Sequence, residues 1–379
     1  MGEHIYMVAY SYAPNTASTN RLQAYLKRFV EKGLRVTLVY FHPDASYSKH
    51  ESLPVGVDAL YYWERKYSSN KYVQLILNHL NIIHFVKDLP KGAKVFVYGA
   101  VDVVHELVKR KDIHVFHERT EHPEAIGYRK IPFSPSLKQY LKDCRKLEAL
   151  FVISTCLKDY FVENGVEEGK VIIVNMIVDP TRYDGVERTS SERYVAYCGV
   201  IYNNKDGVDD LIRAFAKVSA CHKDVKLYIL GKIMTSSDSE ANMKLIEELN
   251  LKEKIKLCGE VPASEMPQML KNAEVLLLAR PDGLRARAGF PTKLGEYLMS
   301  ENPVVVTAVG DMPLFLEDKV SALLAEPGNI QEFADKVNWC LEHQELSRQI
   351  GFEGKHIALK DFNYQIETNK LINQLQLIN

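Results

Sequence analysis

The residues best suited to bind a charged ligand lie between Arg280 and Val306, in the stretch RPDGLRARAGFPTKLGEYLMSENPVVV. Its Gly-Phe-Pro turn leads into a helix predicted to begin near Thr292, and the unpaired N–H groups of a helix start can hold an anion such as a diphosphate. Lys293 adds a positive charge in the first turn. Glu296 lies on the same side of the helix as Thr292, where its carboxylate can accept hydrogen bonds from two neighbouring hydroxyls.

A second stretch of this kind is YCGVIYNNKDGVDDLIRAF, residues 197–215. A predicted strand ends at Gly199, a polar loop follows, and a helix begins near Val208, which is again an arrangement that binds anions. Lys205 in the loop can contact such an anion, although a solvent-facing charge explains this lysine equally well.

The stretch FHERTEHPE, residues 116–124, gathers two histidines and three carboxylates after a predicted strand. Loops at strand ends often carry binding residues, so His117, Glu118 and Glu121 are candidates. A metal site of His117, Glu121 and His122 is disfavoured, because these residues do not share a helix face, and a solvated charge cluster is the remaining alternative.

Three further loops follow predicted strands. In the first, residues 11–22, Asn20 and Arg21 stand near a helix start and are candidates to bind an acceptor or a phosphate. The other two, Gly231–Lys232 and Gly259–Val261, carry glycines that allow a ligand to approach the main chain closely, and the resemblance described below implies that they frame a base.

Apolar runs alternate with amphipathic segments along nearly the whole chain, as in parallel sheets with crossover helices. The alternation stops at the polar stretch of residues 179–193 and then restarts. We therefore predict two doubly wound Rossmann-like domains that face one cleft, of residues 1–185 and 186–359, and a helix of about residues 360–379 that packs back on the first. The predicted strands are His4–Tyr10, Leu34–Tyr40, Lys94–Tyr98, His114–His117, Ala149–Ile153, Val171–Val174, Tyr194–Cys198, Lys226–Leu230, Ile255–Cys258, Val275–Leu278 and Val304–Thr307.

Composition narrows the class of protein further. The 379 residues are 46% hydrophobic and 26% charged, which is typical of folded globular chains. Six widely spaced cysteines form no metal or disulfide pattern, and neither a signal peptide nor an apolar run of bilayer length is visible, so we expect a cytoplasmic protein.

The charge is unevenly distributed. Residues 1–190 carry 26 Lys and Arg against 22 Asp and Glu, whereas the remainder carries 22 against 27. The first half could rest on the inner face of a membrane, although ordinary surface charge is the simpler explanation. Without a dense basic run, nucleic-acid binding is not expected.

The sequence G-F-P-T-K-L-G-E-Y, followed by a short strand, resembles the family-4 retaining glycosyltransferases of the glycosyl transferases group 1, which have the GT-B fold. In that family the last glutamate of an E-x7-E motif binds the donor ribose, and Glu296 matches it. The first glutamate falls on Ala288; main-chain groups at Gly289 and Phe290 could still face the sugar, and Arg285 or Arg287 could supply a replacement contact. Val200 stands where many relatives have an arginine.

The resemblance implies that the C-terminal domain binds a nucleotide sugar and that the N-terminal domain binds a carbohydrate, lipid-linked or small-molecule acceptor, without a metal or other cofactor. Expected to act in the reaction are His117, Lys205, Lys293 and Glu296. Expected donor contacts are Gly199, Lys205, Gly231, Lys232, Gly259, Val261, Gly289, Phe290, Pro291, Thr292, Lys293 and Glu296, and expected acceptor contacts are Asn20, Arg21, Glu118 and Glu121.

No side chain is an obvious nucleophile, so the resemblance favours front-face retention, in which stabilising charge on the leaving phosphate lowers the barrier. Polysaccharide or glycoconjugate assembly is the expected setting. Two alternatives stay open: a nucleotide-sugar epimerase or phosphorylase on the same fold, and a protein that binds sugar nucleotides without catalysis.

Overall fold

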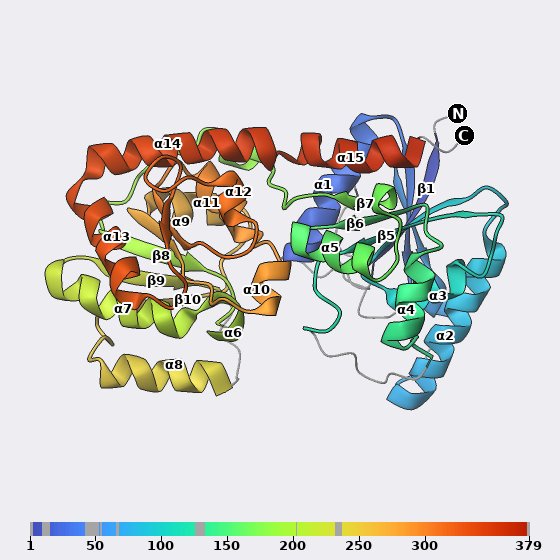
Figure 1. Ribbon diagram of the computed structural model, residues 1–379, viewed down its shortest axis with the longest axis horizontal. Helices are drawn as coiled ribbons and strands as arrows, with labels where there is room; N and C mark the ends of the chain where they lie inside the picture. The colour runs from blue at the N-terminus through green and yellow to red at the C-terminus, as the bar shows by residue number, and fades with distance from the viewer. Residues whose placement is uncertain are drawn as a thin grey trace. The chain divides into compact units, whose positions relative to one another are not determined.

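The computed structural model describes residues 3–9, 16–41, 53, 55–65, 68–125, 133–201, 203–231 and 237–376. It divides into two compact units, one of Met1–Asn175 together with Tyr364–Asn379 and one of Met176–Asn363. Each unit is built on its own parallel sheet (Figure 1). This confirms the predicted fold class of two doubly wound α/β domains.

The first unit has a seven-stranded sheet in the order β3-β2-β1-β4-β5-β6-β7. Every pair of neighbouring strands is parallel, and strands such as β6 are buried along their whole length, as expected when helices cover both faces of a sheet. The strands are β1 His4–Ala9, β2 Arg35–Tyr40, β3 Val57–Tyr61, β4 Lys94–Tyr98, β5 His114–Arg119, β6 Ala149–Val152 and β7 Val171–Ile173.

In the first unit, α1 and α15 lie on one face of the sheet and α2, α3 and α4 on the other (Figure 1). Side-chain caps start several of these helices: Thr16 accepts from the N–H of Thr19 at the start of α1, and Ser136 accepts from that of Gln139 at the start of α4. The helices are α1 Ala17–Glu31, α2 Lys71–Asp88, α3 Val101–Leu107, α4 Leu137–Cys144, α5 Thr155–Glu163 and α15 Tyr364–Gln376, with 3-10 turns η2 Tyr62–Arg65 and η3 Glu168–Lys170.

The second unit has a six-stranded parallel sheet in the order β10-β9-β8-β11-β12-β13. The strand order reverses between β8 and β11, and in such sheets ligands bind beyond the C-terminal ends of the strands at this point. The strands are β8 Tyr194–Cys198, β9 Lys226–Leu230, β10 Ile255–Gly259, β11 Val275–Leu278, β12 Val304–Thr307 and β13 Leu323–Ala325.

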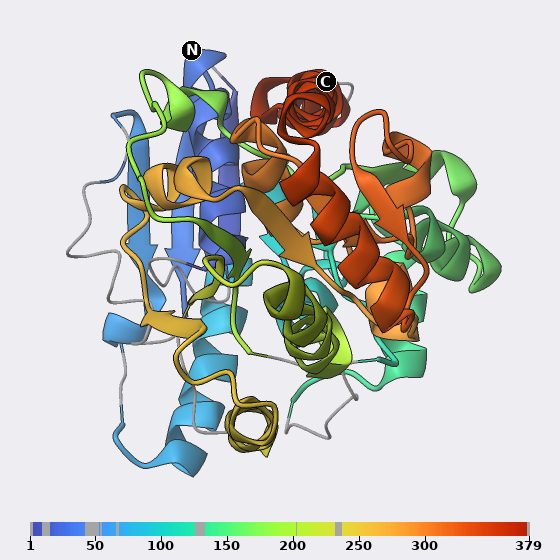
Figure 2. The same ribbon diagram turned by 90° about the vertical axis from the view of Figure 1, so that its left-hand side faces the viewer.

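Helices cover both faces of this second sheet, with α7 and α13 packed against each other on one side and α11 against α14 on the other (Figures 1 and 2). The helices are α6 Asn203–Asp206, α7 Val208–Cys221, α8 Ser237–Glu248, α9 Met266–Asn272, α10 Leu284–Ala288, α11 Lys293–Met299, α12 Met312–Phe315, α13 Ile330–Glu342 and α14 Gln344–Asp361, with the 3-10 turn η4 Pro180–Tyr183. Among the helices of the described ranges, none combines the length and apolar character needed to cross a bilayer.

The units divide at different positions from the predicted boundaries of 185/186 and 359/360. Residues 176–185 belong to the second unit, because the Gly295 N–H donates to Met176 Sδ (3.2 Å) and the Val178 N–H donates to the carbonyl of Phe362. At the other end α15 returns to the first unit, where the Tyr364 hydroxyl donates to Glu31 Oε1 at 2.7 Å.

The sequence missed the short strands β3 and β13 and, among the longer helices, α5 and α13. It ended β5 at His117, two residues before its end at Arg119. Both strands lie at an edge of their sheets, where a few alternating residues carry little periodic signal.

Candidate functional site

The loops that follow β8 and β11 meet at the point where the strand order of the second unit reverses. The ion pair of Lys293 and Asp206 joins them: Lys293 Nζ donates to Asp206 Oδ2 at 2.6 Å and to the Tyr197 hydroxyl at 3.1 Å, and Tyr197 in turn donates to the same carboxylate oxygen at 2.9 Å. The structure therefore brings the two predicted anion-binding stretches together through side chains, Lys293 from one and Asp206 from the other.

The Lys293–Asp206 pair is nearly enclosed, with 15% of the lysine side chain and 8% of the aspartate exposed. Burial alone would raise the pKa of Asp206, but Lys293 and, to a smaller extent, Arg280 and Tyr197 hold this pKa below its ordinary value. The carboxylate is thus ionised and pairs with Lys293 in this structure. Sequence reasoning named Lys293 but missed Asp206, because one carboxylate in a polar loop gives no signal.

Two glycines make the close approach of these loops possible. A side chain at Gly199 would place its Cβ 2.5 Å from Lys293 Nζ, and one at Gly207 would lie 1.8 Å from the carbonyl oxygen of Ala279. Gly207 also has a φ of 63°, in the region that other residues rarely adopt. The loop after β8 can therefore pack directly on the main chain that follows β11.

Glu296, the predicted ribose ligand, is held by two residues of the linker between the sheets. Arg182 Nη1 forms an ion pair with its carboxylate, and the Tyr183 hydroxyl donates to Glu296 Oε2 at 2.8 Å. About a fifth of the Glu296 side chain is exposed, and burial raises its pKa while Arg182 and Tyr183 oppose the rise. Both residues lie in a polar stretch without a periodic pattern, so the sequence did not indicate them as partners of Glu296.

The arginines of the stretch 280–287 differ in their partners. Arg287 forms an ion pair with Asp282 at 3.1 Å on the surface. Within the part of the chain that the structure describes, Arg285 has no ion pair and its buried Nε has no hydrogen-bond partner. Of the two arginines that could take over the role of the motif glutamate at position 288, Arg285 is the one whose charge is not already paired.

The remaining donor candidates act through the main chain or lie in the core. The N–H of Gly231 donates to the carbonyl of Gly259 at 2.8 Å, which joins the two loops that were predicted to frame a base. Phe290 is 6% exposed and packs against Phe315, so its side chain belongs to the core. The other main-chain candidates are Val261 and Gly289, both partly exposed, Pro291, which is buried, and Thr292, which immediately precedes α11. Lys232 lies outside the described residues.

Lys205 is partly exposed in α6, and its carbonyl oxygen accepts a hydrogen bond from Arg280. Lys205 immediately precedes Asp206 in the sequence, and through its main chain it contacts Arg280.

The candidates of the first unit are placed differently from the prediction. His117 is inside β5, fully buried, with Nδ1 on the carbonyl of Val97 (2.9 Å) and Nε2 on the Tyr140 hydroxyl (2.8 Å). Burial lowers its pKa to about 3, against a smaller opposing contribution from Val97. The expectation that His117 stands at a strand end and reaches a ligand is therefore wrong for this structure: it is a neutral core residue.

Glu118 and Arg21 form a buried ion pair within the same unit. Arg21 Nε donates to Glu118 Oε1 at 2.7 Å, and the guanidinium also donates to the carbonyls of Val174 and Asn175. The pair fastens α1 to the sheet, so Arg21 and Glu118 are both buried and are not the acceptor contacts that the sequence suggested. Asn20 is exposed and Glu121 partly exposed, so a ligand can reach both.

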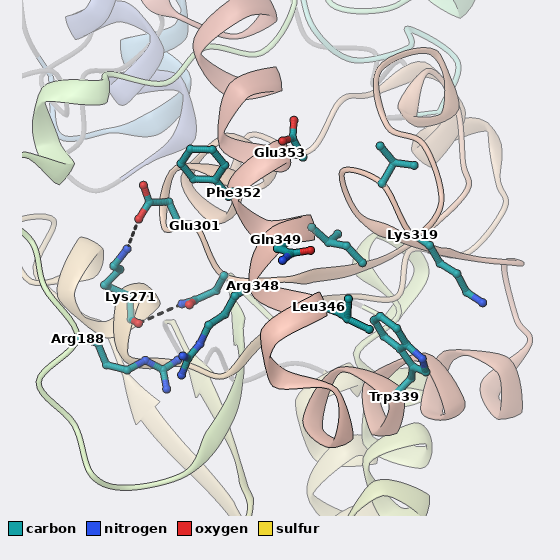
Figure 3. A pocket seen from close by; sticks show the side chains of 13 residues that line it. Arg188, Lys271, Glu301, Lys319, Trp339, Leu346, Arg348, Gln349, Phe352 and Glu353 are labelled. Atoms are coloured by element: carbon teal, nitrogen blue, oxygen red, sulfur yellow. Dashed lines mark hydrogen bonds and ion pairs between the residues drawn. The ribbon is translucent and has the colours of Figure 1, made fainter.

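A hollow of the second unit lies away from these residues. It measures about 1000 Å³ and lies along α14, with Arg188, Lys271, Trp339, Arg348 and Phe352 among its lining residues (Figure 3). None of the predicted site residues lines it. In the described ranges, no group of three or more His, Cys, Asp or Glu side chains is arranged to hold a metal ion.

Comparison with known proteins finds a family model that matches most of the second unit. Residues 184–357 match the family model described as "Glycosyl transferases group 1". Among curated proteins, the chain is 25% identical over 239 residues to a trehalose synthase of Thermococcus litoralis, an alignment that covers 58% of this chain and 55% of that protein. It is 23% identical over 171 residues to the N-acetyl-alpha-D-glucosaminyl L-malate synthase of Bacillus anthracis, with 45% and 41% covered. The alignments thus span about half the length of these relatives.

Solved structures match over nearly the entire chain. Anabaena Alr3699/HepE, solved in complex with UDP and glucose, superposes with a TM-score of 0.76 at 16% identity and 98% coverage of both chains. The sucrose-phosphate synthase of Thermosynechococcus elongatus gives a TM-score of 0.76 at 13% identity, with both chains fully covered. At these identities the superpositions establish the fold.

Proposed function

From the premise that residues 184–357 form a glycosyl transferases group 1 domain within a GT-B fold, we propose that the protein is a glycosyltransferase of the retaining family-4 type. It transfers a sugar from a nucleoside-diphosphate sugar, bound by the second unit, to a glycan, lipid-linked or small-molecule acceptor bound by the first. Assembly of a polysaccharide or glycoconjugate in the cytoplasm is the setting that fits such an enzyme.

One observation carries the proposal: an excess of positive charge gathers where the strand order of the second unit reverses. Lys293 and Arg280 converge there around one carboxylate, Asp206. A diphosphate would balance this excess, and partly buried cations attract an anion more strongly than cations in water. Glu296 follows Lys293 by one turn of α11, the spacing at which it could grip the adjoining pentose.

In the proposed reaction the bond between the anomeric carbon and the leaving phosphate oxygen breaks, and the acceptor oxygen attacks from the same face. Negative charge grows on the leaving diphosphate, where Lys205 and Lys293 would stabilise it. The departing phosphate takes the acceptor proton. Because Lys293 is already bound to Asp206 in this structure, the donor must compete with that carboxylate. We expect the reaction to need no metal, so that chelation with EDTA leaves the rate unchanged.

Solved structures of two neighbouring proteins carry UDP or UDP-glucose, so UDP-glucose and UDP-N-acetylglucosamine open the donor panel, followed by GDP- and ADP-sugars. A ligand that binds the folded state raises the melting temperature by mass action, and the donor that does so is then incubated with candidate acceptors. Lys293→Ala and Glu296→Ala should abolish transfer and donor hydrolysis. Hydrolysis at the unmodified rate in both variants would refute the assignment.

Two alternatives give different products in the same experiment. An epimerase or phosphorylase would convert the donor without an acceptor. A protein that only binds sugar nucleotides would show the shift in melting temperature and no turnover with any acceptor. The substitution of the motif glutamate by the fully buried Ala288 is the observation that keeps this second alternative in view.

We further propose that the first unit rests on an anionic membrane through the start of α2. Two polar side chains of α2, Gln74 and Asn81, are buried, whereas Tyr72, Val73 and Ile76 near its start are exposed. Residues 65–87 include four Lys or Arg and no Asp or Glu. An exposed apolar stripe in a stretch of sequence rich in Lys and Arg is suited to the surface of a bilayer that carries acidic lipids.

A further inference from the structure

Arg280 carries a charge and yet is almost completely enclosed, with 1% of its surface exposed. It follows β11 at the point where the strand order reverses, and its own carbonyl oxygen is held by the Thr307 hydroxyl at 2.7 Å. The side chain therefore starts from a fixed position in the sheet, and its direction is set by what the guanidinium contacts.

The guanidinium contacts the main chain of two separate loops. Nε donates to the carbonyl oxygen of Lys205, in the loop after β8, and Nη1 donates to that of Gly289, in the turn before α11, both at 3.3 Å. Gly289 lies so close that a Cβ at this position would be 3.6 Å from Nη2. One side chain thus links the two stretches that bring Asp206 and Lys293 together.

The charge of Arg280 is only partly balanced. Burial lowers its pKa, with Asp206 acting in the opposite direction, yet no carboxylate lies within ion-pair distance of Arg280 in the described chain. A buried charge without a close partner is costly, and an apolar side chain would fill the same space at lower cost. Packing alone therefore does not account for an arginine at this position.

We propose that Arg280 is a positioning residue of the donor site, which fixes the loop of residues 199–207 against the turn of residues 289–292. In this role Arg280 holds the two loops so that Lys293 can turn from Asp206 to a diphosphate. When Lys293 turns away, the positive charge of Arg280 still balances the carboxylate of Asp206. The inference rests on the proposed function for the identity of the ligand, but the link between the loops is a property of the chain itself.

The test uses the full chain with Arg280→Lys and Arg280→Met. Lysine keeps the charge but lacks the planar fork that reaches two carbonyls. Titration calorimetry measures the affinity for UDP and for uridine, and the difference between the two is the contribution of the diphosphate. GDP and guanosine replace them if the unmodified chain prefers guanine nucleotides. Both variants should bind the nucleoside diphosphate about tenfold or more weakly, since hydrogen bonds to charged groups are removed, and the nucleoside within about twofold of the unmodified chain.

Arg188→Met is the matched control, because Arg188 also donates to a main-chain carbonyl, that of Ala273, but lines the hollow along α14 (Figure 3). It should leave both affinities unchanged. Wild-type binding by Arg280→Lys would overturn the proposal by showing that charge suffices. Equal losses for nucleoside and diphosphate would overturn it by showing general damage to the fold.

A ligand-free measurement keeps the inference separate from the proposed function. In the unmodified chain the N–H of Gly207 donates to the carbonyl of Asn203 and that of Gly289 to the carbonyl of Arg285. In Arg280→Lys these two amides should exchange with deuterium about tenfold faster, while the amides inside β12 keep their rates. Unchanged exchange would refute the linking role even if the protein binds no nucleotide, whereas failure of the unmodified chain to bind any nucleoside diphosphate would refute only the function.

Discussion

Removal of Lys293 should have two separable effects, one on stability and one on ligand binding. The lysine pairs at 2.6 Å with a carboxylate that is only 8% exposed. Truncation of one partner of a buried pair costs about 3–5 kcal/mol, because the other charge stays buried. Here Tyr197 still donates to Asp206 and Arg280 stays near it, so we expect Lys293→Ala to lower the free energy of unfolding of the second unit by about 2 kcal/mol.

The double variant Lys293→Ala/Asp206→Asn tests this reasoning. It removes both charges and should recover most of the stability, to within about 1 kcal/mol of the parent. It should not recover binding of the nucleoside diphosphate. The pH dependence has a definite sign: the pKa of Asp206 is lowered in the folded state, so its stabilising contribution is present above the unfolded pKa of about 4 and is lost as the pH falls through the folded value.

The two tryptophans make a unit-specific assay possible. Trp63 lies in η2 of the first unit and Trp339 in α13 of the second, so in a Trp63→Phe background the fluorescence reports the second unit alone. Urea midpoints then give stability, and calorimetry gives affinity. Parent-like binding by the double variant would mean that Lys293 serves only to neutralise Asp206, and the assignment of the anion site would fail.

Three further outcomes are expected. Burial lowers the pKa of His117 to about 3 in the folded chain, whereas in the unfolded chain this histidine becomes protonated below about pH 6.5. The free energy of unfolding should therefore fall by about 2 kcal/mol between pH 6.5 and 5. His117→Gln should remove this pH dependence, as measured by urea titrations followed by circular dichroism. Gly207→Ala should lower the melting temperature far more than Gly259→Ala, because both glycines have positive φ but only at Gly207 would the Cβ clash, 1.8 Å from a carbonyl oxygen; equal losses would contradict this. Tyr72→Ser/Ile76→Ser should weaken co-sedimentation with phosphatidylserine vesicles by about tenfold, since two apolar side chains no longer enter the bilayer surface, and binding that is unaffected by the change would exclude α2 as the docking surface.

The structure supplied several residues that the sequence could not. Arg182 and Tyr183 stand in a polar linker more than a hundred positions from Glu296, and nothing in their local pattern marks them as its partners. Arg280 opens a stretch that the sequence singled out, but an arginine after a strand suggests a surface charge until burial is known. His117 is the reverse case, since a polar residue in a charged stretch suggested a site where the fold has a core.

The pattern of neighbouring residues along the chain was sufficient to predict the class of fold. The alternation of apolar runs and amphipathic segments is a property of neighbouring residues, so two parallel sheets and the position of most strands follow from it without any knowledge of distant contacts. The G-F-P-T-K-L-G-E-Y segment likewise marks its own turn and helix. The sequence does not show which side chains share a pocket, because this depends on strand order and on how closely two main chains approach. Only the folded chain, with Gly207 lying against Ala279 and Arg280 between two loops, decides that Lys293 meets Asp206 and that His117 is enclosed in the core.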